Sequence, residues 1–349
     1  MKRNPNNLPT AFTSVEELEE FLSRPREDVM EALRQLSGDL LILGVGGKMG
    51  PTLAMLAQRC VTDAGLKNKV IGVDLFPDRQ VEGRLQKAGV QTLHCDVTDP
   101  KALEELPDVD NLIFMVGMKF GTTGKEPATW AINSFVPGLV ARRFAGTRTV
   151  VFSSGNVYPM VPVLSGGCLE RTPPAPLGEY AQSVLGRERN FAYFANQSKS
   201  PVLFFRLNYS VEMRYGVLWD IAQKVWNDQP VNVSMGHANV LWQGDANAYA
   251  LRCLALAESP PRILNVTGPE TLCVRQVAHL FGTRMKRDVL IEGEEQSTAL
   301  LSNAQEAFRL LGYPTMPASR VIQWLASWVS AGGESLGKPT KFQVRDGKF

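Results

Sequence analysis

Histidine and cysteine are scarce in this 349-residue chain, and neither forms the pattern of a metal site or a disulfide framework. The three histidines lie far apart, and the five cysteines are scattered without a Cys-x-x-Cys pair. Structural zinc sites need closely spaced ligands, and disulfide frameworks need cysteines that can pair. The sequence therefore predicts no metal site and reduced, mostly buried thiols.

Long apolar runs and an excess of charge of one sign are also missing. No stretch reaches the roughly 18 apolar residues of a membrane helix, and residues 1–7 lack the apolar run of a secretory signal. The formal net charge is only +2, which does not favour a nucleic-acid partner. These absences predict a cytoplasmic protein that acts on a small molecule, with no nucleic-acid partner and no membrane.

Short apolar runs alternate with helical segments from residue 39 onwards. The runs are 39–44, 70–74, 90–94, 112–116, 149–153 and 202–206. Strands of a parallel sheet that is covered by helices on both faces have this composition. The predicted fold class is α/β, a doubly wound parallel sheet (Rossmann) with a smaller C-terminal α/β substrate-binding portion and an N-terminal helical extension.

The same pattern predicts three parts of the chain. Residues 1–38 form the helical extension, 39–207 the dinucleotide-binding Rossmann domain, and 208–349 mainly the substrate-binding portion with a C-terminal tail. Ser14 and Glu17 form a capping box that opens one short helix, and Pro25 can start a second. We expect both helices to pack on the main domain.

A glycine-rich loop follows the first predicted strand, and a helix start at Pro51 follows the loop. The loop reads Gly44-Val45-Gly46-Gly47-Lys48-Met49-Gly50. Glycines at this place let backbone amides approach a diphosphate at a helix N-terminus, although a turn without a ligand has the same composition. Asp74, at the end of the second run, can bind an adenosine ribose and repel a 2′-phosphate. Together they predict NAD as the cofactor, with NADP less favoured.

These residues belong to a wider set that resembles the extended short-chain dehydrogenase/reductase superfamily. The resemblance is to its NAD-dependent epimerase/dehydratase branch, which includes UDP-galactose 4-epimerase, and it covers about residues 39 to 330. Gly44, Gly47 and Gly50 match its Gly-x-x-Gly-x-x-Gly, and Ser153-Ser154 matches the serine-bearing end of its fifth strand. The Gly-Lys-Met-Gly stretch is also similar to dihydrodipicolinate reductase, but the serine and tyrosine landmarks do not belong to that family.

The resemblance implies roles for individual residues. Cofactor contacts are implied for Gly44, Gly47, Lys48, Met49, Gly50, Asp74, Asp96, Val97, Val116, Gly117, Lys119, Ser153 and Tyr180. Catalytic roles are implied for Tyr180, Ser154, Asn133 and Lys119. In the family the tyrosine moves a proton to or from a substrate oxygen that the serine positions, while hydride moves to or from the nicotinamide.

The chain departs from the family at the residue that activates this tyrosine. The usual pattern is Tyr-x-x-x-Lys, and the position four residues after Tyr180 is Val184. A lysine there lowers the pKa of the phenol by its charge and holds the nicotinamide ribose, and valine can do neither. Lys119 or Arg187 can compensate, although for Arg187 a solvated charge on the helix surface is the favoured interpretation.

The residues that select a substrate are poorly specified. Arg206, Tyr209, Glu212 and Arg214 follow the sixth run, at the edge where open α/β folds bind ligands, but Arg206 is equally compatible with a structural ion pair. The tryptophans at 219, 226, 242, 324 and 328 favour packing roles over sugar stacking. A free sugar, a sugar acid or glycoside and a nucleotide sugar all stay open, as does a homodimer.

The sequence thus favours an NAD-dependent oxidoreductase or epimerase that acts on a hydroxyl or carbonyl carbon of a sugar or sugar derivative. The alternative is a catalytically impaired NAD-binding sensor or scaffold protein. Ser154, Tyr180 and Asn133 favour the enzyme, and Val184 favours the sensor.

Overall fold

A seven-stranded parallel sheet forms the centre of the computed structural model, which describes residues 8–119, 121, 123–338 and 340–348. The strand order is β12-β7-β5-β4-β1-β2-β3. The strands are β1 (Leu40–Leu43), β2 (Val70–Asp74), β3 (Gln91–His94), β4 (Asn111–Phe114), β5 (Arg148–Ser154), β7 (Val202–Leu207) and β12 (Arg262–Val266). The six apolar runs are confirmed as strands, and the doubly wound α/β fold class is confirmed.

Helices cover both faces of the sheet because its strands are apolar on both sides. All four residues of β1 and of β4 are buried. One face packs against α2 (Glu27–Arg34), α3 (Gly50–Asp63), α10 (Gln243–Cys253) and α12 (Gln305–Leu311), with α4 (Arg79–Lys87) beside them. The other packs against α5 (Pro100–Glu104), α7 (Val136–Arg143) and α8 (Gly178–Ser198). Two hydrophobic layers thus enclose one sheet.

The direction of winding reverses beside β1. This strand pairs with β2 on one side and with β4 on the other, both in parallel. In open α/β sheets the crevice for a ligand forms at such a switch point, at the carboxyl ends of the strands. The fold therefore places a binding crevice above β1 and β4.

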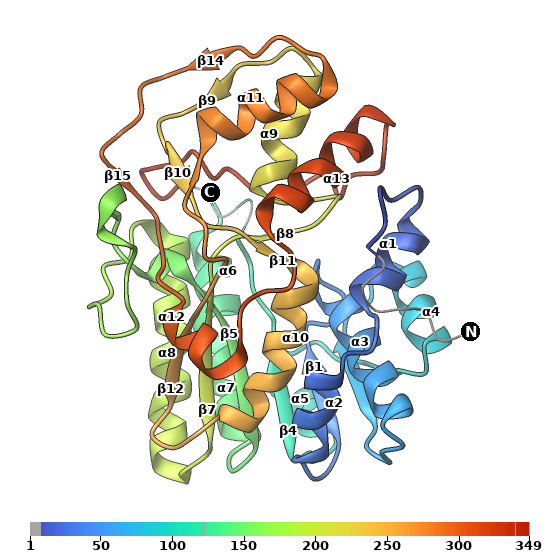
Figure 1. Cartoon of the computed structure of the whole chain (residues 1–349). Helices are drawn as coiled ribbons and strands as arrows, with labels where there is room; N and C mark the ends of the chain where they lie inside the picture. The colour runs from blue at the N-terminus through green and yellow to red at the C-terminus, as the bar shows by residue number, and fades with distance from the viewer. Residues whose placement is uncertain (1–7, 120, 122, 339, 349) are drawn as a thin grey trace.

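A smaller portion lies beyond this edge of the sheet, above it in Figure 1. It contains α9 (Val217–Trp226), α11 (Val274–Met285) and α13 (Ala318–Ser330) around a second apolar core. Short strand pairs complete it: β8 (Ser210–Val211) with β11 (Leu241–Trp242), β9 (Val231–Asn232) with β14 (Ile291–Glu292), and β10 (His237–Ala238) with β13 (Leu272–Cys273). A further pair joins β6 (Val161–Pro162) to β15 (Thr298–Ala299).

The chain crosses between the two portions more than once. The strand β12 and the helix α10 pack in the sheet portion, although both follow residue 207 in the sequence. The predicted ranges 39–207 and 208–349 therefore do not coincide with the two portions. The second range also contains elements of the sheet portion.

The two N-terminal helices pack in different cores. Ser14 Oγ accepts a hydrogen bond from Glu17 N at 3.2 Å, so the capping box opens α1 (Val15–Leu22) as predicted. The helix α2 joins the main core, but Leu18 and Leu22 of α1 are buried in the second one. The helix α1 also contacts α3 and α10, so it packs on the main domain as expected while its apolar side chains join the second core. Residues 1–7 of the predicted extension lie outside the described residues.

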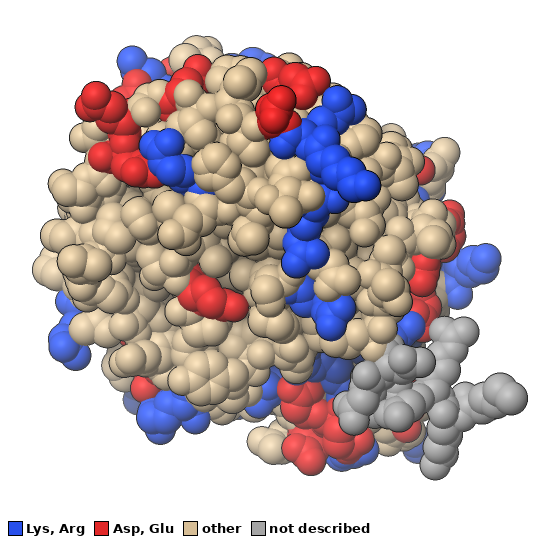
Figure 2. Space-filling view, turned by 45° about the horizontal axis from the view of Figure 1, so that its top comes forward, with Lys and Arg blue, Asp and Glu red and all other residues tan. Residues whose placement is uncertain are grey.

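The surface carries both signs of charge. On the face shown in Figure 2, a short run of Lys and Arg side chains is flanked by Asp and Glu side chains, which accords with a net charge of +2. None of the described helices is long and apolar enough to cross a membrane.

Candidate active site

A cavity of about 540 Å³ opens at the carboxyl ends of the central strands. Segments that follow β1, β4, β5 and β7 line it, as the switch point requires. Its volume lies within the range of small-molecule sites. The structure brings ten of the predicted site residues to this cavity: Gly44, Gly47, Lys48, Met49, Gly50, Gly117, Lys119, Ser153, Ser154 and Tyr180.

The glycines of the loop after β1 have different tasks. Gly44 has φ +83°, and a Cβ there would lie 2.8 Å from Val116 N. A Cβ on Gly50 would lie 2.2 Å from Val45 O, so this glycine lets α3 approach the loop. Gly47 is exposed, and its Cβ position meets only Gly44 O, at 3.4 Å. Gly47 thus keeps the outer surface of the loop bare at the N-terminus of α3, where backbone amides favour an anion.

Asp74 holds this loop against the end of β2. One carboxylate oxygen accepts a hydrogen bond from Gly46 N at 2.9 Å, and the other accepts from Leu75 N at 2.8 Å. A Cβ on Gly46 would lie 3.0 Å from the Asp74 carboxyl carbon, so the close approach depends on glycine. The carboxylate therefore stands beside the diphosphate loop, but it does not line the cavity.

Three other predicted cofactor residues also lie outside the cavity lining. Asp96 is exposed after β3, and its carboxylate accepts hydrogen bonds from Thr98 N at 2.9 Å and Thr98 Oγ1 at 2.7 Å. These bonds lower the pKa of Asp96. Val97 and Val116 are half-buried against the core of the sheet. The cofactor contacts of Asp96, Val97 and Val116 remain predictions.

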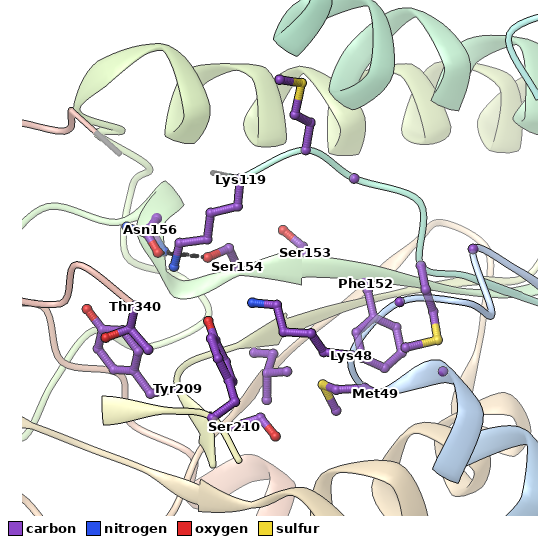
Figure 3. A pocket seen from close by; sticks show the side chains of 18 of the residues that line it. Lys48, Met49, Lys119, Phe152, Ser153, Ser154, Asn156, Tyr209, Ser210 and Thr340 are labelled. Carbon is purple, nitrogen blue, oxygen red and sulfur yellow. Dashed lines mark hydrogen bonds between the residues drawn. The ribbon is translucent and has the colours of Figure 1, made fainter. Parts of the chain in front are cut away.

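Tyr180 and Ser154 meet at the cavity. Tyr180 lies in the first turn of α8, and Ser154 ends β5. Ser154 Oγ donates to Asn156 Oδ1 at 2.9 Å and accepts from Asn156 N at 3.1 Å, which fixes the hydroxyl at the strand end (Figure 3). Burial raises the pKa of Tyr180, and the charge of Arg187 and a hydrogen bond with Ser154 oppose that rise. Both side chains line the cavity, and their roles in proton transfer remain predictions.

Arg187 is buried beside this pair, and the interpretation of it as a solvated surface charge was wrong. Its side chain is 5% exposed and lines the cavity. One terminal nitrogen donates to Phe152 O at 2.6 Å, and the other donates to Asn133 Oδ1 at 3.0 Å. Burial lowers the pKa of Arg187 to about 10, while Tyr180 and Glu188 oppose the decrease. A cation therefore faces the tyrosine from the same helix.

The Val184 side chain does not reach the cavity. It is 1% exposed and packs with Val157, Tyr158 and Cys168, outside the cavity lining. The position that carries lysine in the family therefore belongs here to a small apolar cluster, which valine suits.

Asn133 supports the site through its hydrogen bonds. It lies in a π-helical turn, η1 (Ala131–Phe135), between α6 (Glu126–Trp130) and α7, and is 0% exposed. Its side chain accepts from Met118 N and donates to Met118 O, both at 2.8 Å, and donates to Ser183 Oγ at 3.1 Å. Because Met118 precedes Lys119, these bonds fix the segment that carries this lysine. The contacts are those of a positioning residue.

Two lysines extend into the cavity from different segments (Figure 3). Lys119 follows β4, and its Nζ lies 5.5 Å from the centre of the Tyr180 ring and 5.8 Å from that of Tyr209. Burial lowers its pKa to about 8. Lys48 Nζ lies 3.5 Å from the centre of the Tyr215 ring. Each ammonium group thus lies near the face of at least one tyrosine ring, an arrangement that favours cations.

Only one of the four residues considered for substrate contact reaches the cavity. Tyr209 lines it. Arg206 is buried in a two-bond ion pair with Glu188, at 2.8 and 2.6 Å, which confirms the structural alternative. Glu212 and Arg214 pair with each other at 2.9 Å in the interior, and Arg214 also pairs with Glu19 of α1 at 2.9 Å.

The tryptophans considered above are packing residues. Trp242, Trp324 and Trp328 are buried in the second core, and Trp219 and Trp226 pack against it. The prediction of packing roles over a sugar-stacking surface is confirmed.

The sequence assigned no role to several polar residues of the cavity. They are Asn156, Asn208, Ser210, Tyr215, Gln243, Lys338 and Thr340. Asn156 lies close to the serine landmark Ser153-Ser154 in the sequence, and this proximity could have indicated a place in the cavity. Lys338 and Thr340 come from the C-terminal segment, whose approach to the loop after β1 depends on tertiary structure alone.

Comparison with known proteins establishes the fold of the chain. No family model matches the sequence, and no curated protein matches it. Solved structures match closely in shape. The UDP-glucuronic acid 4-epimerase of Bacillus cereus in complex with NAD has a TM-score of 0.69 and 16% identity, with 84% of this chain and 99% of that chain covered.

Two other enzymes give the same picture. The UDP-glucose 4-epimerase of Thermotoga maritima with UDP-glucose has a TM-score of 0.69 and 14% identity, covering 84% of this chain and 99% of that one. The enzyme WbmG of Bordetella bronchiseptica with NAD and UDP has a TM-score of 0.68 and 18% identity, covering 86% of this chain and 96% of that one. The chain has the fold of extended short-chain dehydrogenases/reductases. Nothing among these matches supports the alternative of an impaired sensor.

Proposed function

We propose that this chain is an NAD-dependent oxidoreductase or epimerase that acts on a hydroxyl or carbonyl carbon of a sugar or sugar derivative. The observation that carries the proposal is the convergence of the glycine-rich loop, Ser154, Tyr180 and Lys119 on one cavity. Proteins with the same fold that are bound to NAD, to UDP-sugars or to UDP support it.

The residues around the loop fit a dinucleotide. The bare surface at Gly47 leaves room for a diphosphate over the amides at the start of α3. The Asp74 carboxylate beside the loop can accept hydrogen bonds from ribose hydroxyls and repels an additional phosphate, which favours NAD over NADP. When bound, NAD supplies the acceptor or donor of hydride.

The chain itself supplies the proton chemistry. In the oxidative direction the Tyr180 phenolate removes the proton of a substrate hydroxyl, and Ser154 holds the substrate oxygen by its own hydroxyl. In the reductive direction the Tyr180 phenol returns the proton to the carbonyl oxygen. Lys119, beside the Tyr180 ring, favours the phenolate by its positive charge.

Arg187 takes over part of the role of the absent lysine in this proposal. Its charge lowers the pKa of Tyr180 although burial raises that pKa overall. Its bonds to Phe152 O and Asn133 hold the guanidinium in place. With valine instead of lysine at position 184, Tyr180 still has a neighbouring cation, Arg187. This cation offsets only part of the pKa increase that burial causes.

Turnover measurements with Tyr180→Phe test the proposal. The protein is incubated with NAD and a panel of UDP-sugars and free sugars, and reduced nicotinamide and epimeric products are followed. We expect turnover by the native chain and a loss of at least about 100-fold in Tyr180→Phe, the contribution of a general base.

The matched control is Tyr193→Phe, because Tyr193 lies on the same helix with its side chain exposed. This variant should keep native turnover. Undiminished turnover in Tyr180→Phe would exclude the tyrosine mechanism.

A further inference from the structure

The cavity is lined by several basic side chains. Three lysines reach it from separate segments: Lys48 from the glycine-rich loop, Lys119 after β4, and Lys338 from the C-terminal segment. Arg187 adds a fourth cation, and among the described residues that line the cavity there is no aspartate or glutamate. A concave site with charges of one sign concentrates ligands of the opposite sign.

Lys48 is directed towards the smaller portion of the molecule. Its ammonium group lies over the ring of Tyr215, between β8 and α9, at 3.5 Å from the ring centre. Burial, together with the charges of Lys119 and Lys338, lowers the pKa of Lys48 to about 6, and Asp220 opposes this decrease. An anion placed among these lysines would relieve their mutual repulsion.

The C-terminal segment holds Lys338 at the edge of the cavity. Thr340 N donates to the buried Asp220 carboxylate at 2.7 Å, and Thr340 Oγ1 donates to the same oxygen. Further along, Arg345 donates to Thr298 O at 2.8 Å. The residues that follow the exposed Lys338 thus bind the segment to the smaller portion.

The same segment also reaches the helix of the catalytic tyrosine. Gly347 packs on the backbone just before Tyr180, where a Cβ on Gly347 would lie 2.4 Å from Leu177 O. The segment therefore forms a fixed strap between the smaller portion and the start of α8, with Lys338 and Thr340 facing the cavity.

We propose that the substrate carries a carboxylate or phosphate group that binds between Lys48 and Lys338, beside Tyr215. This inference rests on the proposed function, which assigns the substrate to this cavity. The diphosphate of NAD is expected at the loop amides near Gly47, whereas Lys48 Nζ is directed to Tyr215 and Lys338 comes from the strap. We therefore assign both lysines to the substrate, which for Lys48 departs from the cofactor contact that the resemblance implied.

Calorimetry with three sugars that differ only at C6 tests this inference. D-glucose, D-glucuronate and D-glucose 6-phosphate are titrated into the protein in the presence of saturating NAD. We expect glucuronate or glucose 6-phosphate to bind at least about tenfold more tightly than glucose, because charge-assisted hydrogen bonds are the stronger ones. The preference between the two anionic sugars distinguishes a carboxylate from a phosphate.

Two lysine variants locate the anion. Lys338→Met removes an exposed charge and should abolish most of this preference while NAD affinity stays native, and Lys48→Met should act in the same direction. Lys348→Met, an exposed lysine of the same segment outside the cavity, is the matched control and should retain the preference. Equal responses to the three sugars, or a preference that survives in Lys338→Met and Lys48→Met, would overturn the inference.

NAD binding separates this inference from the proposed function. If the native chain does not bind NAD, the proposed function fails. If NAD binds and the sugars show no charge preference, only the inference fails. If Lys338→Met weakens NAD but not the anionic sugar, the lysines serve the cofactor and the inference is wrong.

Proton uptake gives an independent check. The groups around Lys48 are Lys119, Lys338, Asp220 and the Tyr215 ring. Because its pKa in the free protein is about 6, Lys48 is mostly neutral at pH 7.5, and a neighbouring anion raises that pKa. Binding of the anionic sugar should therefore take up protons at this pH, as calorimetry in buffers of different ionisation enthalpy can show, and Lys48→Met should remove most of the uptake.

Discussion

At the scale of single residues, the proposed function depends on Arg187 for the activation of Tyr180. Its guanidinium is the cation that the same helix offers to the tyrosine, in place of a lysine at 184. Because the pKa of Tyr180 stays above its usual value of 10, the phenolate is a minor species at neutral pH. Turnover in the oxidative direction should therefore increase with pH through the neutral range and beyond pH 8.

Replacement of Arg187 should move this increase to higher pH. Loss of a close cation raises the pKa of a phenol by about one to three units, so Arg187→Met should lower oxidative turnover at pH 8 by about tenfold or more. Arg187→Lys retains the charge and should restore part of the rate. The pH–rate profiles of the three proteins measure the effect.

Arg189→Met is the control for this experiment, because Arg189 lies on the same helix and is exposed. A purely structural role of Arg187 would reduce thermal stability without a displacement of the profile. An unchanged profile in Arg187→Met would thus refute electrostatic activation by this residue.

At the scale of elements, hydrogen bonds from the π-helical turn η1 link the segment after β4 to the helix α8. Asn133 bonds Met118 on one side and Ser183 and Arg187 on the other. Single-turn π-helices often occur at functional sites, where they redirect a side chain. Here the turn aligns the segment of Lys119 with the helix of Tyr180.

Asn133→Ala should therefore weaken both stability and activity. Loss of the amide leaves buried partners without hydrogen bonds, which costs about 1–3 kcal/mol of the free energy of unfolding. Denaturant unfolding measures this cost, and Asn227→Ala, at an exposed asparagine, is the control. Native stability and native turnover in Asn133→Ala would contradict the positioning role.

The sequence predicts the elements well where local composition determines them. The apolar runs at 39–44 and 70–74 became β1 and β2 because a strand that is buried on both faces has to be apolar throughout. The glycine-rich loop was predictable for a similar reason, since Gly44 and Gly50 leave no room for a Cβ. Ser154 and Tyr180 meet as the resemblance implied.

The sequence could not predict contacts that depend on how deeply tertiary packing buries a side chain. Arg187 has the spacing of a helix-surface charge, and only the packing of α8 on β5 brings its guanidinium to Phe152 O. Asn133 has its role through a widened helical turn that periodicity does not reveal. Lys338 reaches the cavity because the C-terminal segment is bound to Asp220, far away in the sequence.

At the scale of the whole molecule, the cavity lies where two hydrophobic cores meet. The sheet core positions the glycine-rich loop and the strand ends, and Tyr209 packs against the second core. The C-terminal segment joins the second core to α8. In the proposed function, a cofactor held by the sheet portion would therefore face a substrate held by the smaller portion.

Calorimetric titration of NAD into the native chain and into Gly47→Val tests the central claim, which is that this cavity holds the dinucleotide. A valine side chain at this exposed position would occupy the space that is left for the diphosphate. We predict that the native chain binds NAD, that Gly47→Val loses binding with an unchanged circular dichroism spectrum, and that Gly83→Val, at a helix position with open space around it, keeps it. Native NAD affinity in Gly47→Val would show that the loop is only a turn and would contradict the account.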